Sequence, residues 1–188
     1  MHTALKQRIE MMRGKIQQSA PVMTVPASSQ VFVTPENTCH RLVLLAGITD
    51  QDTILEPSAG TGAILRAIRA VAPAAACDAV ELNVQLCDYL RREFNDVNVI
   101  CSDFLHYAPQ KRYSHIIMNP PFNRAADIHH IQHACTLLKP GGVLTAICLN
   151  GPRQNEILKP LAEHWEPLPG GLFAYTGVST AILRLTVA

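Results

Sequence analysis

Short apolar runs and amphipathic segments alternate along the chain from residue 53 onward. Runs such as TILEP at 53–57 and GVLTAICL at 142–149 have the length and apolar character of buried strands. Between them, segments such as 83–94 repeat apolar residues at the three- and four-residue spacing of a helix. The pattern predicts strands at 53–57, 76–82, 97–103, 113–120 and 142–149, and helices at 62–72, 83–94, 126–138 and 153–164.

This alternation predicts an α/β fold, in which a mostly parallel sheet carries helices on both faces. Two further strands are expected at 165–173 and 179–188, after a last helix that Pro160 interrupts. Because no helical segment separates these two strands, we expect an antiparallel last strand. The whole pattern therefore predicts a seven-stranded sheet.

The beginning of the chain carries a separate helical pattern. Apolar residues recur at helical spacing within residues 1–20, namely Leu5, Ile9, Met12 and Ile16. The segment 19–29 follows with two prolines and is typical of a loop. We therefore expect an N-terminal amphipathic helix that docks or oligomerises, followed by a single domain over 21–188, a length that one core can fill.

Composition limits the class of protein but does not indicate what the protein binds. The chain is 48% apolar and 16% charged, which is typical of a globular protein. No apolar run approaches the ~20 residues of a membrane span, and no apolar stretch near the N-terminus suggests a secretory signal, so a cytoplasmic location without membrane contact is expected. The formal net charge of +1 gives no strong basic field. Six cysteines include no Cys-x-x-Cys pair, which favours buried reduced thiols.

The first candidate for chemistry is EPSAGTG at 56–62, directly after the first strand. Gly60 and Gly62 permit tight turns and close approach of a ligand, and the next helix starts at this loop with free N–H groups. The segment is neither a Gly-x-Gly-x-x-Gly fingerprint nor a P-loop, so a dinucleotide or ATP is not the first choice. An ordinary turn between a strand and a helix is the alternative.

Acidic residues close the second and third strands. Glu81 follows Gly60 at nearly the ~20-residue spacing at which a carboxylate accepts hydrogen bonds from a ribose diol. Asp103 can accept from an exocyclic adenine amine, and Phe104 can lie on the ring. Ligands of open parallel sheets bind at the carboxyl ends of the strands, so these residues predict a nucleoside across the first three strands.

The fourth strand ends in MNPPFN, at 118–123. Two prolines remove backbone donors and fix φ, so the Asn119 side-chain oxygen and the Pro120 carbonyl can aim at one point. Two acceptors that converge on a planar amine bind its protons and leave its lone pair free to attack an electrophile. Phe122 can stack on the ring that carries the amine. A plain proline-rich turn is the alternative.

These segments, in this order, resemble the Rossmann-like S-adenosylmethionine-dependent methyltransferases, and more narrowly the amino-group methylases that include N6-adenine DNA methyltransferases. The resemblance covers about residues 30–187, including VFVTP at 31–35 and LLKPGG at 137–142. It implies a Rossmann-like methyltransferase fold with S-adenosyl-L-methionine as cofactor. The residues implied in cofactor binding are Thr34, Pro35, Glu56, Pro57, Ser58, Ala59, Gly60, Gly62, Glu81, Leu82, Asp103, Phe104 and Asn119. The catalytic signature is Asn119, Pro120, Pro121 and Phe122.

The resemblance makes N6 of adenine in DNA the first choice of substrate. RNA bases and a protein glutamine amide remain alternatives, because Asn-Pro-Pro-aromatic segments also occur in enzymes that methylate a glutamine amide or a guanine exocyclic amine. Only a short segment separates Pro121 from the strand at 142–149, so no separate target-recognition domain is expected. A second copy or a companion subunit could supply recognition. Phe122 and Arg124 are candidates for substrate contact, with Arg124 and Arg153 as candidate phosphate contacts.

A metal site is a weaker interpretation of HHIQHAC at 129–135. His129 and His133 share a helix face at a spacing that suits metal ligands. Methyl transfer from S-adenosylmethionine needs no metal, and no matching pair of ligands stands elsewhere at clear spacing. We therefore expect a packing helix whose apolar residues point inward, and no metal.

Overall fold

The computed structural model describes residues 34–171 and 177–188. The strands are β1 (Thr53–Pro57), β2 (Ala76–Glu81), β3 (Val97–Cys101), β4 (Tyr113–Met118), β5 (Leu138–Leu149), β6 (His164–Pro167) and β7 (Thr180–Thr186). The α-helices are α2 (Glu36–Ala46), α3 (Ala63–Val71), α4 (Val84–Glu93), α5 (Ala126–Leu137) and α6 (Pro152–Ile157). Short 3-10 turns occur at η2 (Phe104–His106), η3 (Asn123–Ala125) and η4 (Lys159–Leu161).

The seven strands form one sheet in the order β3-β2-β1-β4-β5-β7-β6. The neighbouring strands from β3 to β5 pair in parallel, and β7 pairs antiparallel with both β5 and β6. The predicted Rossmann-like fold with an antiparallel last strand is therefore confirmed. The strand order changes direction between β1 and β4, which is where parallel sheets of this type open a ligand crevice.

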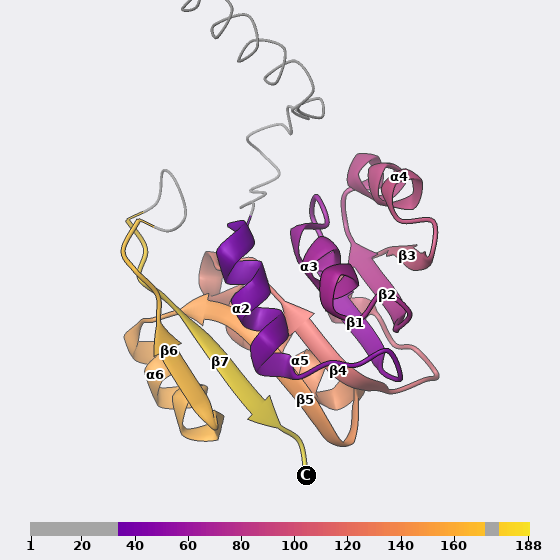
Figure 1. Cartoon of the computed structure of the whole chain (residues 1–188). Helices are drawn as coiled ribbons and strands as arrows, with labels where there is room; N and C mark the ends of the chain where they lie inside the picture. Colours follow the sequence, from indigo (N-terminus) through magenta and orange to yellow (C-terminus); the bar gives the residue numbers. More distant parts are fainter. Residues whose placement is uncertain (1–33, 172–176) are drawn as a thin grey trace, which may run out of the picture.

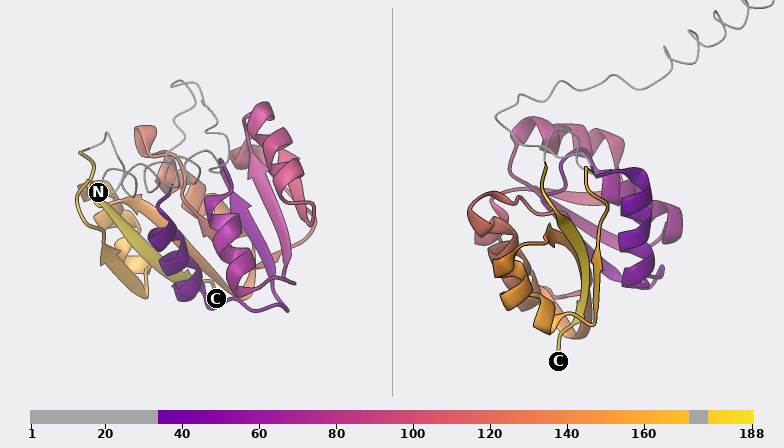
Figure 2. Two further views of the ribbon diagram at one scale, coloured as in Figure 1. Left: turned by 45° about the horizontal axis from the view of Figure 1, so that its top comes forward. Right: turned by 90° about the vertical axis from the view of Figure 1, so that its left-hand side faces the viewer.

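Helices cover both faces of the sheet (Figures 1 and 2). On one face, apolar side chains of α2, α3 and α4 form a core cluster that includes Leu42, Ile68 and Leu90. On the other face, α5 supplies Ile128 and Ile131 to a second cluster. The sheet thus lies between two cores, and its carboxyl-end loops are held from both sides.

Local sequence explains where several helices begin. Asn83, the expected N-cap of α4, accepts hydrogen bonds from the backbone N–H groups of Gln85 and Leu86, which have no partner within the helix. The helix predicted at 153–164 ends at Ile157, and η4 follows around Pro160, as expected from a residue that cannot continue a helix.

Helix α2 was not predicted. Its residues Cys39, Leu42, Val43 and Ala46 are buried and follow helical spacing, which is the signal in the sequence that points to it. Pro35 precedes its first turn and Gly47, at φ 70°, ends it. The amphipathic helix expected within residues 1–20 lies outside the described residues.

The cysteines of the described residues are all free. Four are buried as expected, whereas Cys101 is exposed and Cys135 is half-buried. Of the helices at 34–171 and 177–188, none has the length and apolar character needed to cross a membrane.

Candidate functional site

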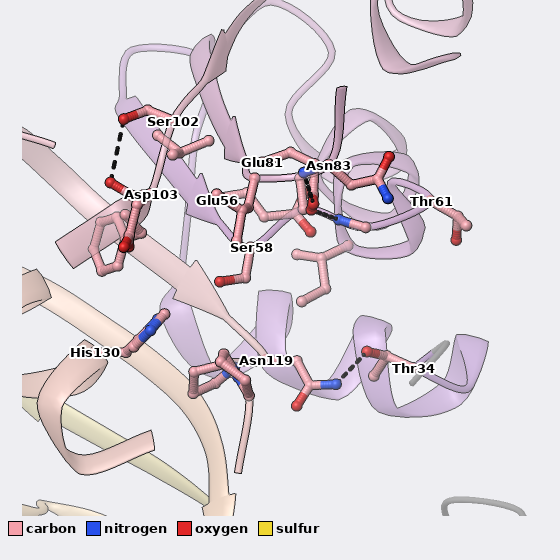
Figure 3. Close-up of a pocket in the computed structure, with 18 of the residues that line it drawn as sticks. Thr34, Glu56, Ser58, Thr61, Glu81, Asn83, Ser102, Asp103, Asn119 and His130 are labelled. Atoms are coloured by element: carbon pink, nitrogen blue, oxygen red, sulfur yellow. Dashed lines mark hydrogen bonds between the residues drawn. The ribbon is translucent and has the colours of Figure 1, made fainter. Parts of the chain in front are cut away.

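A pocket of about 600 Å³ opens at the carboxyl ends of β1, β2, β3 and β4 (Figure 3). It gathers residues from all four segments that the sequence singles out. From the predicted set, its lining includes Thr34, Glu56, Ser58, Ala59, Gly60, Glu81, Leu82, Asp103, Phe104, Asn119, Pro120 and Pro121. Pro35, Pro57, Gly62, Phe122 and Arg124 belong to the predicted set but are not among the lining residues.

The loop after β1 is shaped by left-handed backbone conformations. Ser58, Gly60 and Gly62 have φ values of 60°, 56° and 74°. The Ala59 N–H donates to the Val80 carbonyl at 3.1 Å, which ties the loop to the neighbouring strand. A Cβ atom on Gly62 would lie 2.5 Å from the Phe94 ring, so this glycine is required by packing against α4 and not by the pocket itself.

Glu81 holds two loops together at the end of β2. One of its carboxylate oxygens accepts from the Gly60 N–H at 2.8 Å, and the other accepts from the Asn83 N–H at 2.9 Å. The side chain is buried, with 8% of its residue surface exposed. A carboxylate oxygen has capacity for more than one hydrogen bond, so Glu81 is fixed in position while it keeps lone pairs for a ligand hydroxyl.

Asp103 and Phe104 occupy the end of β3. An Asp103 oxygen accepts from the Leu105 N–H at 2.9 Å, which caps the short turn η2. Phe104 is 3% exposed, and its ring lies edge-on to His133 with centroids 4.9 Å apart. These contacts place a carboxylate and an aromatic ring side by side at one end of the pocket.

Asn119 stands at the end of β4 with its amide in one orientation. Its Nδ2 group donates to the Thr34 hydroxyl at 2.9 Å (Figure 3). Its Oδ1 atom is buried and has no hydrogen-bond partner in the described part of the chain. Pro120 and Pro121 line the pocket beside it. The Thr34 contact therefore turns an unpaired acceptor away from the threonine and leaves it available.

Phe122 and Arg124 lie elsewhere. Phe122 is 9% exposed and packs in the core cluster on the α2 side of the sheet. Arg124 is exposed at φ 52°, and the next residue, Ala125, has φ 60°. Stacking of Phe122 on a substrate ring stays a prediction, as does a substrate contact by Arg124.

Burial shifts the pKa values of two titratable groups in the pocket. Burial raises the pKa of Glu56 well above its ordinary value, an effect that the charge of Glu81 increases and that Leu65 N–H and Arg66 oppose. Its Oε2 atom has no partner within the described residues. Burial also lowers the pKa of His130 to about 4, so this imidazole is neutral at pH 7.

His130 is a pocket residue that was not predicted from the sequence. It falls on the buried face of α5 at helical spacing with Asp127, Ile131 and Ala134, which is the pattern that could have found it. Within 34–171 and 177–188, no group of three or more His, Cys, Asp or Glu side chains is arranged to hold a metal ion, at these histidines or elsewhere.

The residues present fit an adenosine-type cofactor with a positively charged end. Glu81 and Asp103 offer acceptors, Leu82 and Phe104 offer apolar surface, and Glu56 offers an unpaired carboxyl oxygen. Unpaired buried polar atoms are costly, and three of them surround one cavity, on Glu56, Asn119 and His130. This arrangement is expected where a ligand supplies the missing partners.

Comparison with known families gives one match to the sequence over most of its length. Residues 24–167 match the family model described as "Methyltransferase small domain". A curated relative, ribosomal RNA small subunit methyltransferase A of Prosthecochloris aestuarii (strain DSM 271 / SK 413), is 38% identical over 76 residues. That match covers 40% of this chain and only 28% of the relative.

Solved structures share the fold at low identity. A putative class I S-adenosylmethionine-dependent methyltransferase from Listeria monocytogenes has a TM-score of 0.72 at 17% identity, covering 88% of this chain and 63% of that one. A putative RNA methyltransferase from Pyrococcus horikoshii has a TM-score of 0.70 at 19% identity, covering 93% and 96%. A modification subunit of a putative type I restriction enzyme from Vibrio vulnificus YJ016 has a TM-score of 0.67 at 15% identity, covering 97% and 49%.

Proposed function

Since the chain belongs to the methyltransferase small domain family and is an S-adenosylmethionine-dependent methyltransferase, we propose that it methylates an exocyclic amine, namely N6 of adenine in DNA. The observation that carries the proposal is the Asn119 amide. Its Oδ1 atom is a buried acceptor without a partner in the described chain, beside two pocket-lining prolines. An amine with two protons is the group that such an acceptor fits.

The cofactor, when bound, supplies an electrophilic methyl group. Glu81 would accept from its ribose hydroxyls, and Asp103 and Phe104 would hold its adenine. The loop at 58–60 and Thr34 would border its amino-acid end. Glu56 would face a positive charge there, which favours the ionised carboxylate that burial alone disfavours.

The chemical role of the chain is to activate the acceptor amine. Asn119 Oδ1 and the Pro120 carbonyl each accept one proton of the amine, which keeps its lone pair free on the opposite side. These acceptors are fixed before the reaction, so they stabilise the positive charge that develops on nitrogen without reorganisation. No proton has to leave before attack, because the methylated amine is acidic enough to lose its proton afterwards.

DNA as the substrate rests on the VFVTP and NPPF segments. In a duplex, the target adenine must leave the base stack to reach Asn119. Arg124 and Arg153 follow β4 and β5 at the pocket edge of the sheet, and both are exposed, so we propose them as phosphate contacts. One structural neighbour with this fold is named as a modification subunit of a putative type I restriction enzyme, which is consistent with a DNA substrate.

Adenine in RNA is the second candidate. The curated relatives that match at 36–38% identity are named as ribosomal RNA methyltransferases. The match spans about a quarter of their length, so the similarity covers part of such an enzyme and not the whole of it. The amine-activating geometry serves RNA and DNA adenine equally well.

The test is a methylation assay with labelled S-adenosylmethionine and three acceptors: duplex DNA, ribosomal RNA and a cell protein extract. Products are digested and identified by mass spectrometry. Asn119→Ala should abolish the label, with a loss of at least about 100-fold. Asn95→Ala is the matched control, because this exposed asparagine lies between α4 and β3, at the opposite edge of the sheet.

The three acceptors distinguish the proposals. N6-methyladenine in DNA that disappears with Asn119→Ala supports the first proposal. N6-methyladenine in RNA alone replaces it with the second. Label on a protein glutamine retains amine activation and ends both nucleic-acid proposals.

A further inference from the structure

The His130 side chain is buried and polar, and one of its ring nitrogens has no hydrogen-bond partner in the described part of the chain. It is 7% exposed and lines the pocket from α5. Its Nδ1 atom is buried and has no hydrogen-bond partner among residues 34–171 and 177–188. Figure 3 shows the ring projecting into the pocket, between Asp103 and Asn119.

The two neighbouring histidines of α5 show that this state is particular to His130. His133 Nε2 lies 3.0 Å from the Tyr107 carbonyl, which satisfies it. His129 is exposed to solvent. A buried imidazole that lacks a partner costs free energy, so its position in the pocket calls for a ligand that offsets the cost.

The surroundings of His130 indicate which part of a ligand it meets. Its ring lies 5.4 Å from the Phe104 ring, centroid to centroid, at an interplanar angle of 45°. Asp103, the residue before Phe104, is close enough to raise the histidine's pKa, although burial outweighs it and leaves the imidazole neutral. Both neighbours belong to the end of the pocket where the proposed function places the cofactor's adenine.

We propose that His130 donates a hydrogen bond from its imidazole to a ring nitrogen of the cofactor's adenine. The inference rests on the cofactor placement of the proposed function. An ionised Asp103 can only accept, so it pairs with the exocyclic amine and leaves the ring nitrogens, which are acceptors, in need of a donor. A neutral imidazole carries one N–H group, and His130 brings it to that end of the pocket. His130 is therefore a positioning residue for the cofactor.

The first measurement is the affinity for S-adenosylhomocysteine by titration calorimetry on the full chain. His130→Phe keeps an aromatic ring against Phe104 but removes both nitrogens. It should weaken binding about three- to tenfold, the worth of one net hydrogen bond. The matched control is His129→Phe, the same substitution on an exposed position of the same helix, which should leave the affinity unchanged.

The second measurement needs no protein variant at first. The affinities of 1-deaza, 3-deaza and 7-deaza analogues of S-adenosylhomocysteine, each lacking one adenine ring nitrogen, are compared on the natural chain. On the natural chain, one analogue should bind more weakly than S-adenosylhomocysteine by the same factor as His130→Phe weakens S-adenosylhomocysteine binding. On the His130→Phe variant, that analogue and S-adenosylhomocysteine should bind equally well. Losses that add on the variant for every analogue would overturn the proposal.

Asp103→Ala separates a failure of this inference from a failure of the cofactor placement. If Asp103→Ala weakens S-adenosylhomocysteine binding and His130→Phe does not, the placement stands and the role of His130 is wrong. If neither variant weakens binding, the adenine does not lie at this end and both are wrong. If His130→Phe raises only the KM for nucleic acid, the histidine contacts the target base and the proposal is overturned.

Discussion

The two halves of the pocket differ in how much of their hydrogen bonding is already complete. At the ends of β2 and β3, Glu81 and Asp103 accept bonds from backbone N–H groups that hold them in place. At the end of β4, Asn119 keeps an unpaired acceptor, and the next turn contains two left-handed non-glycine residues, Arg124 and Ala125. The first half offers acceptors that are already fixed, and we propose that the second is completed when a substrate binds.

This contrast indicates where each half derives its selectivity. A carboxylate that backbone N–H groups hold in place can bind the same hydroxyl or amine of a ligand with or without a substrate in the other half. An unpaired buried acceptor carries a free-energy cost that is recovered when a donor enters, so under the proposed function Asn119 contributes to catalysis and not to the stability of the free protein. Substitutions in each half should therefore have separable effects on cofactor binding, turnover and stability.

The largest effect is expected from Glu81→Ala, in the completed half. It removes the proposed ribose acceptor and leaves the Gly60 and Asn83 N–H groups without their partner. The Kd for S-adenosylhomocysteine should rise about 100-fold, equivalent to ~3 kcal/mol for charge-assisted hydrogen bonds. Glu93→Ala, an exposed glutamate at the end of α4, is the control. An unchanged Kd in a folded Glu81→Ala protein would place the ribose elsewhere.

Thr34→Val should affect mainly the acceptor half. It releases the Asn119 amide and leaves the carboxylates of Glu81 and Asp103 unchanged. The hydroxyl that accepts from Nδ2 at 2.9 Å is lost, and the amide can then rotate its oxygen away from the amine. We expect kcat to fall about tenfold, a loss of ~1.4 kcal/mol, and the Kd for S-adenosylhomocysteine to rise by less than that, because Thr34 borders only the amino-acid end in the proposed cofactor placement. Thr34→Ser retains the hydroxyl and should retain most of the turnover. Equal kcat for the valine and serine variants would rule out this orienting role.

Glu56 is an exception in the cofactor half, as His130 is, because one of its oxygens is unpaired; burial also raises the pKa of Glu56. The unfolded chain ionises this group above its ordinary value of 4.5, whereas the folded chain resists ionisation. Its contribution to the free energy of unfolding is therefore greatest below pH 4.5 and falls as the pH rises towards the folded pKa.

Glu56→Gln should remove that pH dependence. Urea unfolding of the ligand-free proteins should show the glutamine variant more stable at pH 8, by about 1 kcal/mol, with a smaller gain at pH 5. The same variant should bind S-adenosylmethionine more weakly, since the carboxylate no longer faces its positive charge. Parallel stability curves for the two proteins across this pH range would contradict the assignment.

The smallest effect concerns the turn after Asn119. Ala125 has φ 60°, a conformation that costs an L-residue free energy and costs glycine little. Ala125→Gly should raise the free energy of unfolding by about 0.5 kcal/mol. Ala126→Gly is the control with the opposite sign, because Ala126 has the helical φ of −60° and glycine destabilises a helix by about 0.5–1 kcal/mol. A loss of stability in both variants would show that the strain is not significant.

The position of the half that we propose for the cofactor was largely predictable from sequence because its signals are local. The glycine loop at 56–62, Glu81 and Asp103 each lie at or just after the end of a strand, and parallel strands bring such positions to the same end of the sheet. The Asn83 cap and the antiparallel last strand also followed from short segments. Short sequence patterns are enough to predict the position of residues that lie at strand ends and helix starts.

The acceptor half depends on packing between distant segments, which the sequence does not display. The partner of Asn119 is Thr34, 85 positions away, and α2 after it was not predicted. The burial of Phe122 likewise depends on how α2 packs against one face of the sheet. Helical spacing marks the buried faces of α2 and α5, but no periodicity or motif encodes which side chains these helices bring together at the pocket.

The placement of β7 has a consequence for the order in which the polypeptide acquires its structure during synthesis. β7 lies between β5 and β6, although the ribosome makes it after both. Until residues 180–186 emerge, β5 offers an open edge to any other chain, and β6 has no strand to join. The sheet can therefore be completed only after β7, its last strand, has been synthesised. Before that point the unpaired edge of β5 is most exposed to association with other nascent chains.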